Sequence, residues 1–415
     1  MIKPGEKALR FLSWEVGMFF HFGIRSFYPG HRDWDGLEMP AEGFQPRELD
    51  CGEWMRAAKL IGAKYAIMTT KHHDGFALWP SRYTSYSVAA SSWRDGKGDV
   101  VKEFTDACRE NGLKVGLYYS PAQWGATAVN FENGKEYDDY FINQITELLT
   151  GYGKIDYLWF DGCGSDGHEY DQKRIIRVIR SLQPDILIFG MWDPDTVWVG
   201  NEDGYAHEPN LYGKDRVILG EMKHAFLPDE CDCKLRRSWF YDHNEETIKT
   251  VDELIGMYEY SVGRGCNLLL NVGPDDRGRI ANADLTRLNE LRAELIRRYG
   301  APKEFEEITR VDPATYTASI TPRRAAELID SERLPLCTSV VLKEDIRDGQ
   351  KVLGFKLYAH MPSLYPARED KMCVFEGETI GHKRICRFPA IRTSKFTLVL
   401  TQTDGEAVIE DFRVY

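Results

Sequence analysis

The sequence lacks several features that mark specialised classes of protein. No stretch approaches the roughly 18 consecutive apolar residues of a membrane-spanning helix, and no long run of basic residues offers a surface for a phosphate backbone. No G-x-G-x-x-G motif follows the first apolar run that could form a strand. These absences argue against a membrane protein, a nucleic-acid-binding protein and a dinucleotide-binding fold.

Cysteine is present, but not in a pattern that indicates a disulfide framework. The nine cysteines are odd in number, are scattered along the chain and lie mostly in apolar runs, as free thiols do in a reducing compartment. Cys231 and Cys233 form a C-x-C pair with no second pair nearby, so a zinc site is only a minor alternative. The N-terminal residues also lack the pattern of a signal peptide. We therefore expect a cytoplasmic protein.

The length and composition predict a globular protein of two domains. A chain of 415 residues exceeds what one hydrophobic core usually supports, and 43% hydrophobic with 28% charged residues is ordinary for such proteins. The net charge of −12 mainly favours solubility. Aromatic residues make up 12% of the chain, which fits either a larger aromatic core or a cleft that binds sugars.

Apolar runs alternate with amphipathic segments over the first 300 residues. The predicted strands are 16–22, 65–70, 114–120, 155–160, 186–189, 217–219, 238–241 and 268–272. Helical periodicity lies between several of them, at 99–111, 137–149 and 175–182. Strand, helix and strand at this spacing indicate a parallel sheet with crossovers, and eight strands favour a (β/α)8 TIM barrel over an open sheet.

The pattern changes after Tyr299. Strand-like runs without long helices between them occupy 338–342, 350–358, 372–376, 395–400 and 407–415. They predict a small antiparallel β-sandwich. We expect residues 1–300 to form a catalytic barrel and residues 301–415 to form the sandwich.

Polar residues follow the predicted barrel strands, where the active sites of TIM barrels lie. His21 ends the first strand, the run from Lys71 to Asp74 follows the second, and Asp161 stands one step past a buried strand. A rigidly held, partly desolvated carboxylate is what a nucleophile requires. Local sequence alone leaves open that Asp161 caps the following turn and that His21 is a hydrogen-bonded core residue. Adjacent residues such as His72 and His73 point to opposite faces of a strand, so both reach one ligand only if the strand ends there.

Five motifs occur in the order in which a known family has them. They are His21-Phe22-Gly23, Lys71-His72-His73-Asp74-Gly75-Phe76, Gly116-Leu117-Tyr118-Tyr119-Ser120, Leu158-Trp159-Phe160-Asp161-Gly162 and Asn267-Leu268-Leu269-Leu270-Asn271-Val272. Together they resemble the α-L-fucosidases, glycoside hydrolase family 29. Segments 349–352 and 379–384 are similar to that family's C-terminal sandwich, so the resemblance covers essentially the whole chain.

The resemblance implies a retaining double displacement with Asp161 as the nucleophile. The positions that match those holding fucose hydroxyls are His21, Trp34, His72, His73 and Tyr119. Trp159 matches a residue that lines the pocket beside the nucleophile, and Trp239 one that lies against the sugar methyl group or the leaving group. In the pair Asp33-Trp34, aspartate replaces the family's usual glutamate.

The acid/base is implied by a second stretch, 198–206, which is similar to the branch that acts on α-1,3/1,4-linked fucose. It places the acid/base at Glu202; the alternative is that Glu202 is a solvated loop carboxylate without a catalytic role. Asp203, Glu208 and Glu221 are further candidates. Val197 stands where relatives often have a basic residue, which leaves the contacts near the leaving group open.

The expected mechanism needs two carboxyl groups about 5–5.5 Å apart, with Glu202 buried enough to stay protonated and Asp161 kept ionised by donors such as a histidine. It needs no metal and no organic cofactor. The expected substrate is a fucosylated oligosaccharide or glycoconjugate, although another 6-deoxy or galacto-configured sugar is open and no oligomeric state is indicated. Two other functions remain: a non-catalytic sugar-binding barrel, and a metal-dependent hydrolase with His72, His73 and Asp161 as ligands.

Overall fold

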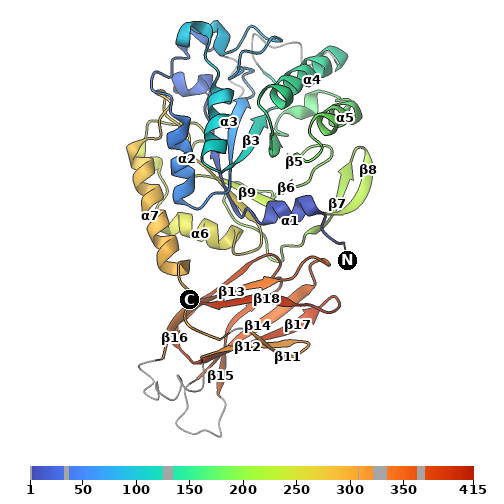
Figure 1. The fold of residues 1–415 in the computed structure, drawn as a ribbon, viewed down its shortest axis with the longest axis vertical. Helices are drawn as coiled ribbons and strands as arrows, with labels where there is room; N and C mark the ends of the chain where they lie inside the picture. Colours follow the sequence, from blue (N-terminus) through green and yellow to red (C-terminus); the bar gives the residue numbers. More distant parts are fainter. Residues whose placement is uncertain (1, 32–36, 125–133, 307, 321–333, 362–369) are drawn as a thin grey trace.

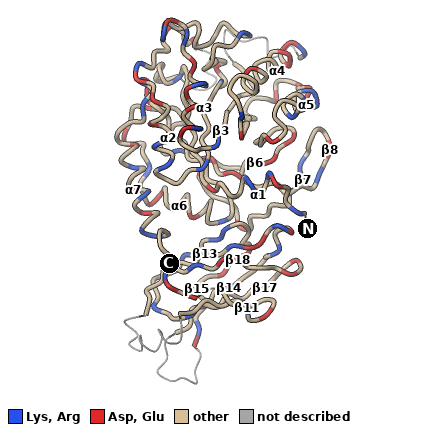
Figure 2. Tube along the Cα trace, in the orientation of Figure 1, with Lys and Arg blue, Asp and Glu red and all other residues tan. Residues whose placement is uncertain are grey.

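The computed structural model describes residues 2–31, 37–124, 134–306, 308–320, 334–361 and 370–415. Figure 1 shows an upper part in which helices surround a sheet, and a lower part built of strands, with the C-terminus close to the lower end of α7. Lysine and arginine residues are interspersed with aspartate and glutamate residues along the chain in both parts (Figure 2). Among the described residues, no helix combines the length and apolar character that crossing a membrane requires.

Eight parallel strands form the barrel, in the order β5-β4-β3-β2-β1-β10-β9-β6. They are β1 (Val16–Phe20), β2 (Tyr65–Lys71), β3 (Lys114–Tyr119), β4 (Tyr157–Phe160), β5 (Leu187–Phe189), β6 (Val197–Trp198), β9 (Asp229–Lys234) and β10 (Asn267–Asn271). An isolated parallel bridge from Phe189 to Thr196 connects the two ends of this order. The predicted TIM barrel is thus confirmed.

Two of the eight predicted barrel strands are wrong. Val217 lies in a hairpin formed by β7 (Gly213–Ile218) and β8 (Glu221–Phe226), which projects at the side of the barrel in Figure 1. Residues 238–241 form no strand. Their places in the barrel are taken by β6, which is only two residues long, and by β9, whose sequence alternates charged residues with cysteine instead of forming an apolar run.

Seven helices lie among the described residues: α1 (Glu6–Leu12), α2 (Cys51–Leu60), α3 (Val100–Glu110), α4 (Gly134–Gly151), α5 (Gln172–Leu182), α6 (Val251–Ser261) and α7 (Asn282–Tyr299). The three predicted helices are confirmed as α3, α4 and α5. Asp99 begins α3 by accepting a hydrogen bond from the backbone N–H of Lys102, and Asp171 begins α5 in the same way.

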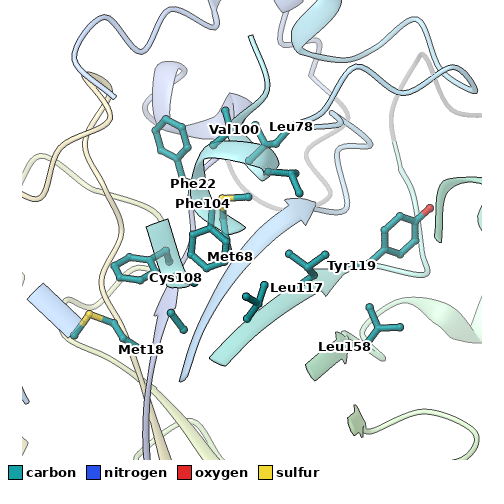
Figure 3. Close-up of a cluster of buried hydrophobic side chains, with 14 of the residues drawn as sticks. Met18, Phe22, Met68, Leu78, Val100, Phe104, Cys108, Leu117, Tyr119 and Leu158 are labelled. Carbon is teal, nitrogen blue, oxygen red and sulfur yellow. The ribbon is translucent and has the colours of Figure 1, made fainter. Parts of the chain in front are cut away.

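The barrel strands bury different side chains on their two faces. The barrel interior is filled by aromatic residues, among them Phe19, Tyr65, Tyr118, Trp159 and Phe189. On the outer faces, aliphatic residues of β2 and β3 meet the apolar face of α3, as Figure 3 shows for Met68, Leu117 and Phe104. Because side chains alternate along a strand, a residue's position decides whether it faces the barrel axis or the helices.

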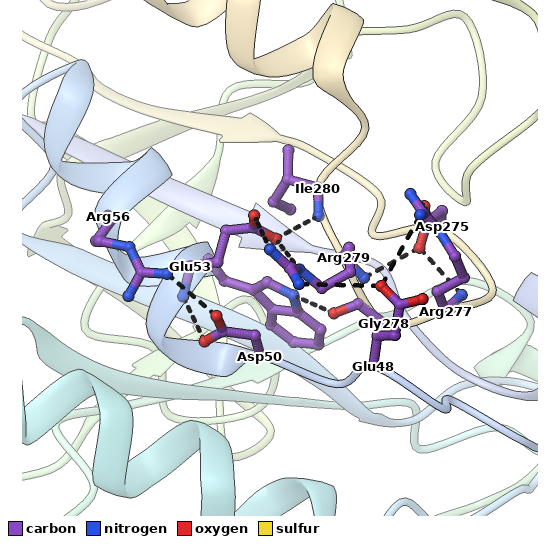
Figure 4. Close-up of polar contacts among 10 residues, drawn as sticks. Glu48, Asp50, Glu53, Arg56, Asp275, Arg277, Gly278, Arg279 and Ile280 are labelled. Carbon is purple, nitrogen blue, oxygen red and sulfur yellow. Dashed lines mark hydrogen bonds and ion pairs between the residues drawn. The ribbon is translucent and has the colours of Figure 1, made fainter.

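The loop after β10 is fixed to the N-terminal end of α2 (Figure 4). Asp50 caps α2 through the backbone N–H of Glu53, and the Glu53 carboxylate pairs with the Arg279 guanidinium through two contacts of 2.7 Å. The Trp54 indole N–H donates to the carbonyl of Gly278 at 3.0 Å. A strand end at the mouth of the barrel is thereby held by a surrounding helix.

The C-terminal part contains two antiparallel sheets, in the orders β11-β12-β17-β14-β15 and β16-β13-β18. Their strands are β11 (Thr309–Asp312), β12 (Thr315–Ser319), β13 (Leu336–Glu344), β14 (Val352–His360), β15 (Lys371–Gly377), β16 (Arg384–Arg392), β17 (Lys395–Thr403) and β18 (Ile409–Val414). A separate hydrophobic cluster, which includes Phe355, Leu398 and Phe412, lies between them. The predicted sandwich is confirmed, and three of its strands, β11, β12 and β16, were not predicted.

Candidate active site

A pocket of about 530 Å³ opens where the barrel strands end. Its lining is aromatic with a few ionisable groups: Phe19, His21, His72, His73, Tyr118, Trp159, Phe160, Asp161, Gly162, Cys163, Phe189, Gly190, Met191, Trp198, Glu202, Asp232 and Trp239. Flat apolar walls with a small number of placed donors and acceptors are typical of a small-molecule site. Seven of the nine sequence-predicted site residues meet here.

Asp161 directly follows β4 and carries three hydrogen-bond contacts. Its Oδ2 accepts from the Tyr118 hydroxyl at 2.8 Å and faces Nε2 of His73 at 3.3 Å, while its Oδ1 accepts from the N–H of Cys163 at 2.9 Å. Burial raises the pKa of Asp161, but these contacts outweigh it and bring the pKa below its usual value. The carboxylate is thus held in one orientation in its ionised form.

His72 and His73 both line the pocket because β2 ends at Lys71, directly before them. Such a strand end is what two adjacent histidines require to reach one ligand. Nδ1 of His73 is hydrogen-bonded to the hydroxyl of Ser120, which orients the ring so that Nε2 faces Asp161. The His72 ring stacks on Tyr118, and burial, the largest cause, lowers its pKa well below the usual value. His72 is therefore a neutral imidazole.

His21 is fixed from the neighbouring strand. Its Nδ1 lies 2.8 Å from Oδ1 of Asn271, while Nδ2 of Asn271 donates to the carbonyl of Trp239. Burial lowers the pKa of His21 to about 3, so the ring is neutral and its proton lies on Nδ1. His21 then offers Nε2 as an acceptor for a hydroxyl group. Asn271, which holds this ring, was not predicted as a site residue, although its position at a strand end was a signal.

Tyr119 does not line the pocket. Its side chain points to the outer face of β3, where the hydroxyl donates to Oε1 of Gln144 at 2.6 Å and the ring packs on Phe141. The position in the pocket belongs to Tyr118, one residue earlier, which contacts Asp161. The assignment of Tyr119 to the site is corrected accordingly, because neighbouring residues of a strand face opposite sides.

The predicted tryptophans occupy different parts of the site. Trp159 stacks on Phe189 with ring centroids 4.1 Å apart, and its indole N–H donates to Oε1 of Glu230 at 2.8 Å. The Trp239 ring lies 4.8 Å from the ring of His21. Trp34 and its neighbour Asp33 lie outside the described residues.

Glu202 lines the pocket from the loop after β6. Its side chain is 44% exposed, and Oε2 accepts a hydrogen bond from the ammonium group of Lys234. The burial that the sequence analysis expected for Glu202 is therefore not found, and the carboxylate is ion-paired instead.

The alternative carboxylates do not line this pocket. Glu208 pairs with Arg384 in a separate hollow of about 610 Å³ between the barrel and the sandwich. Glu221 lies on the exposed hairpin, and Asp203 is bridged to the backbone of Cys233. Among the described residues, the carboxyl groups that line the pocket are those of Asp161, Glu202 and Asp232.

Strand β9 supplies ionisable groups that the sequence analysis missed. Burial raises the pKa of Glu230 to about 7 and that of Asp232 to about 8. Asp232 accepts a hydrogen bond from the indole N–H of Trp198 at 2.7 Å. The alternation of Glu230, Asp232 and Lys234 with Cys231 and Cys233 was a signal for a strand with one polar face.

One group of potential metal ligands lies in the site. Single ligand atoms of His72, His73 and Asp161 lie within 4.8 Å of one another. Oδ2 of Asp161 already accepts the Tyr118 hydroxyl and faces His73, so two of these three residues are also held by contacts within the protein. This donor set fits a carboxylate held for attack as well as it fits a cation.

Comparison with known proteins gives one consistent family. A family model described as alpha-L-fucosidase matches residues 7–300. Alpha-L-fucosidase 1 of Arabidopsis thaliana is 31% identical over 445 aligned positions, which cover 97% of this chain and 86% of that protein.

Solved structures agree with this result. A glycoside hydrolase 29 family member from an unknown rumen bacterium superposes with a TM-score of 0.86 at 31% identity, over 100% of this chain and 77% of that one. A Ruminococcus gnavus GH29 fucosidase, solved in complex with fucose, shares the fold with a TM-score of 0.82 at 24% identity, over 100% and 95% of the two chains.

Proposed function

This chain belongs to the α-L-fucosidase family of glycoside hydrolases, and from that premise we propose that it removes terminal α-L-fucose in two steps with retention of configuration. The observation that carries the proposal is the setting of Asp161. An ionised carboxylate, held by Tyr118, His73 and a backbone N–H in an aromatic pocket, is what attack on an anomeric carbon requires.

The proposed substrate contacts follow from the neutral rings in the pocket. His21 accepts a hydrogen bond from one hydroxyl of fucose through Nε2, and His72 contacts another as a neutral imidazole. Trp159 and Trp239 offer flat surfaces to the C–H faces and the methyl group of the sugar. We propose that Trp34 completes this set, as its sequence motif implies.

In the first step, Asp161 forms a bond to the anomeric carbon as the bond to the leaving oxygen breaks, and Glu202, which acts in the fraction of molecules where it has taken up a proton from solvent, donates that proton to the oxygen. In the second step, Glu202 takes a proton from water, whose oxygen displaces Asp161 and releases fucose. The position of Glu202 in the same pocket as Asp161 supports this division of roles.

Replacement of the nucleophile tests the mechanism. We expect Asp161→Asn to lose about three or more orders of magnitude in kcat, because a covalent intermediate cannot form. In Asp161→Gly, external azide should restore turnover by occupying the space of the carboxylate, and the azide adduct should have inverted configuration by NMR. Wild-type turnover in either variant without azide contradicts the role of Asp161.

We also propose a preference for α-1,3/1,4-linked fucose, supported by the resemblance of segment 198–206 to that branch. Hydrolysis of Lewis-type trisaccharides should be faster than hydrolysis of 2′-fucosyllactose at equal concentration. Faster release from 2′-fucosyllactose contradicts the linkage proposal and leaves the hydrolase activity untouched.

The metal-dependent alternative rests on the cluster of His72, His73 and Asp161. We expect activity to survive dialysis against a chelator. Loss of activity that zinc or another divalent cation restores would favour the alternative.

We further propose that the protein is cytoplasmic, in keeping with nine cysteines that are all free thiols, and cell fractionation tests this.

A further inference from the structure

Strand β9 places a lysine directly against the proposed acid/base. The ammonium group of Lys234 donates to Oε2 of Glu202 and lies 4.6 Å from the centre of the Trp239 ring. Its side chain is only 18% exposed, against 44% for Glu202. A half-exposed carboxylate on a loop is thus contacted by a mostly buried cation on a strand.

Lys234 itself is held firmly. It pairs with Asn271 in the β9–β10 ladder, and its carbonyl accepts a hydrogen bond from the ammonium of Lys249 at 2.5 Å. Asn271 in turn fixes His21 and the carbonyl of Trp239. The lysine therefore belongs to the same rigid frame that orients the sugar contacts, whereas Glu202 comes from a separate loop.

The groups around Lys234 leave its charge directed at Glu202. Asp232 lies two residues earlier on the same face of β9, but burial raises its pKa to about 8, so it is neutral at pH 7. Its Oδ1 accepts from Trp198. The ammonium group of Lys249 donates to the backbone carbonyls of Lys234 and Arg236. One ammonium thus faces one carboxylate.

We propose that Lys234 is a positioning residue that holds Glu202 beside the leaving oxygen through the contact between its ammonium group and Oε2. The inference rests on the proposed role of Glu202. In the first step a proton moves from Glu202 to the leaving oxygen, and in the second step Glu202 takes a proton from water. The contact with Lys234 keeps the carboxyl group of Glu202 in one position for both transfers, so its contribution is to orient the group that moves the proton.

The dependence on leaving group separates this role from a structural one. For Lys234→Met we expect kcat/KM on a fucosylated oligosaccharide, whose leaving oxygen needs a proton, to fall about 10- to 100-fold, as for loss of a charge-assisted hydrogen bond. On α-L-fucosyl fluoride, whose leaving group needs no proton, kcat/KM should fall less than about threefold. Lys234→Arg should restore part of the loss on the oligosaccharide, because it keeps the charge. Lys234→Gln serves as a second neutral variant, and thermal unfolding checks that each variant is folded.

Lys249→Met is the matched control, since it removes a neighbouring ammonium that does not contact Glu202. It should show no difference between the two substrates. Equal losses on both substrates in Lys234→Met and Lys234→Gln, or no loss on either, overturn the inference. The variant Glu202→Gln separates failure of this inference from failure of the proposed function. If Glu202→Gln also loses activity equally on both substrates, or loses none, Glu202 is not the acid.

Discussion

At the scale of single residues, two adjacent tyrosines have separate tasks. Tyr118 donates to the nucleophile at 2.8 Å, while Tyr119 donates to Gln144 on the other face of β3. We expect Tyr118→Phe to lower kcat/KM about 10- to 100-fold, because a hydrogen bond to a charged group contributes about 1.5–3 kcal/mol. Steady-state kinetics with an aryl fucoside measures this.

Tyr119→Phe is the matched control for that prediction. It removes the same hydroxyl from the same strand but leaves Asp161 untouched, so activity should stay within about twofold while stability falls by about 1 kcal/mol. If Tyr119→Phe lost more activity than Tyr118→Phe, the sequence-based assignment of Tyr119 to the substrate would be right after all.

The residues of the pocket show what the sequence could and could not predict about the site. Asp161, His72 and His73 were predicted because strand ends collect polar residues at the mouth of a barrel. Tyr118 was missed because the resemblance to the family points to its neighbour Tyr119, and a shift of one residue along a strand reverses the face on which a side chain lies. Asn271 was missed although it lies at the end of a predicted strand, because the sequence does not show that His21, 250 positions away, lies beside it.

At the scale of elements, β9 explains the largest error in the predicted fold. Inward-facing positions of a barrel are usually apolar, but here they are Glu230, Asp232 and Lys234. Hydroxyl and indole donors satisfy Glu230, including Tyr65 and Trp159. A strand whose inner face carries the polar groups of the site has no apolar run, so a search for hydrophobicity passes over it.

Strand β1 offers a test of this interior. Gly17 leaves room for the Tyr65 ring, since a Cβ there would lie 2.3 Å from Cζ of Tyr65. We expect Gly17→Ala to destabilise the protein by about 1–3 kcal/mol through overpacking, and to displace the tyrosine that donates to Glu230. Chemical denaturation monitored by tryptophan fluorescence measures the change.

Gly256 provides a control of opposite sign. It lies inside α6, and a Cβ there would have no neighbour within 4 Å. Gly256→Ala should stabilise the protein by about 0.5–1 kcal/mol, since alanine favours the helix. The two changes in the free energy of unfolding need not be equal in size. If both substitutions destabilise the protein, the lack of space at Gly17 is not the cause of the destabilisation.

At the scale of the whole molecule, the barrel and the sandwich are joined by polar and apolar contacts. Arg384 and Lys383 of the sandwich pair with Glu208 and Glu15 of the barrel. Ile346 joins an apolar cluster with Leu12 and other barrel residues. We therefore propose that residues 1–300 and 301–415 are two domains that unfold as one unit, because separation would expose these contacts to water.

The stability of the whole protein should also depend on pH through the buried carboxyl group of Glu230. Burial raises its pKa from 4.5 to about 7, so the folded state binds a proton that the unfolded state releases. Below pH 4.5 both states are protonated and the group has no effect. As pH rises from 4.5 to 7 the folded state loses stability, and above pH 7 the loss is complete.

Replacement of Glu230 by glutamine removes this titration without changing the shape of the side chain. A difference of about 2.5 units corresponds to a loss on the order of 3 kcal/mol between pH 4.5 and 7, which Glu230→Gln should not show. Denaturant unfolding of both proteins at several pH values measures it. The difference in the free energy of unfolding between the two proteins should change across this window and then stay constant, because the amide that the substitution introduces does not titrate. The Tyr65 hydroxyl can turn to accept a hydrogen bond from that amide. Parallel stability curves would mean that Glu230 titrates alike in both states, and that its three donors, Tyr65, Tyr157 and Trp159, offset the cost of burying its charge.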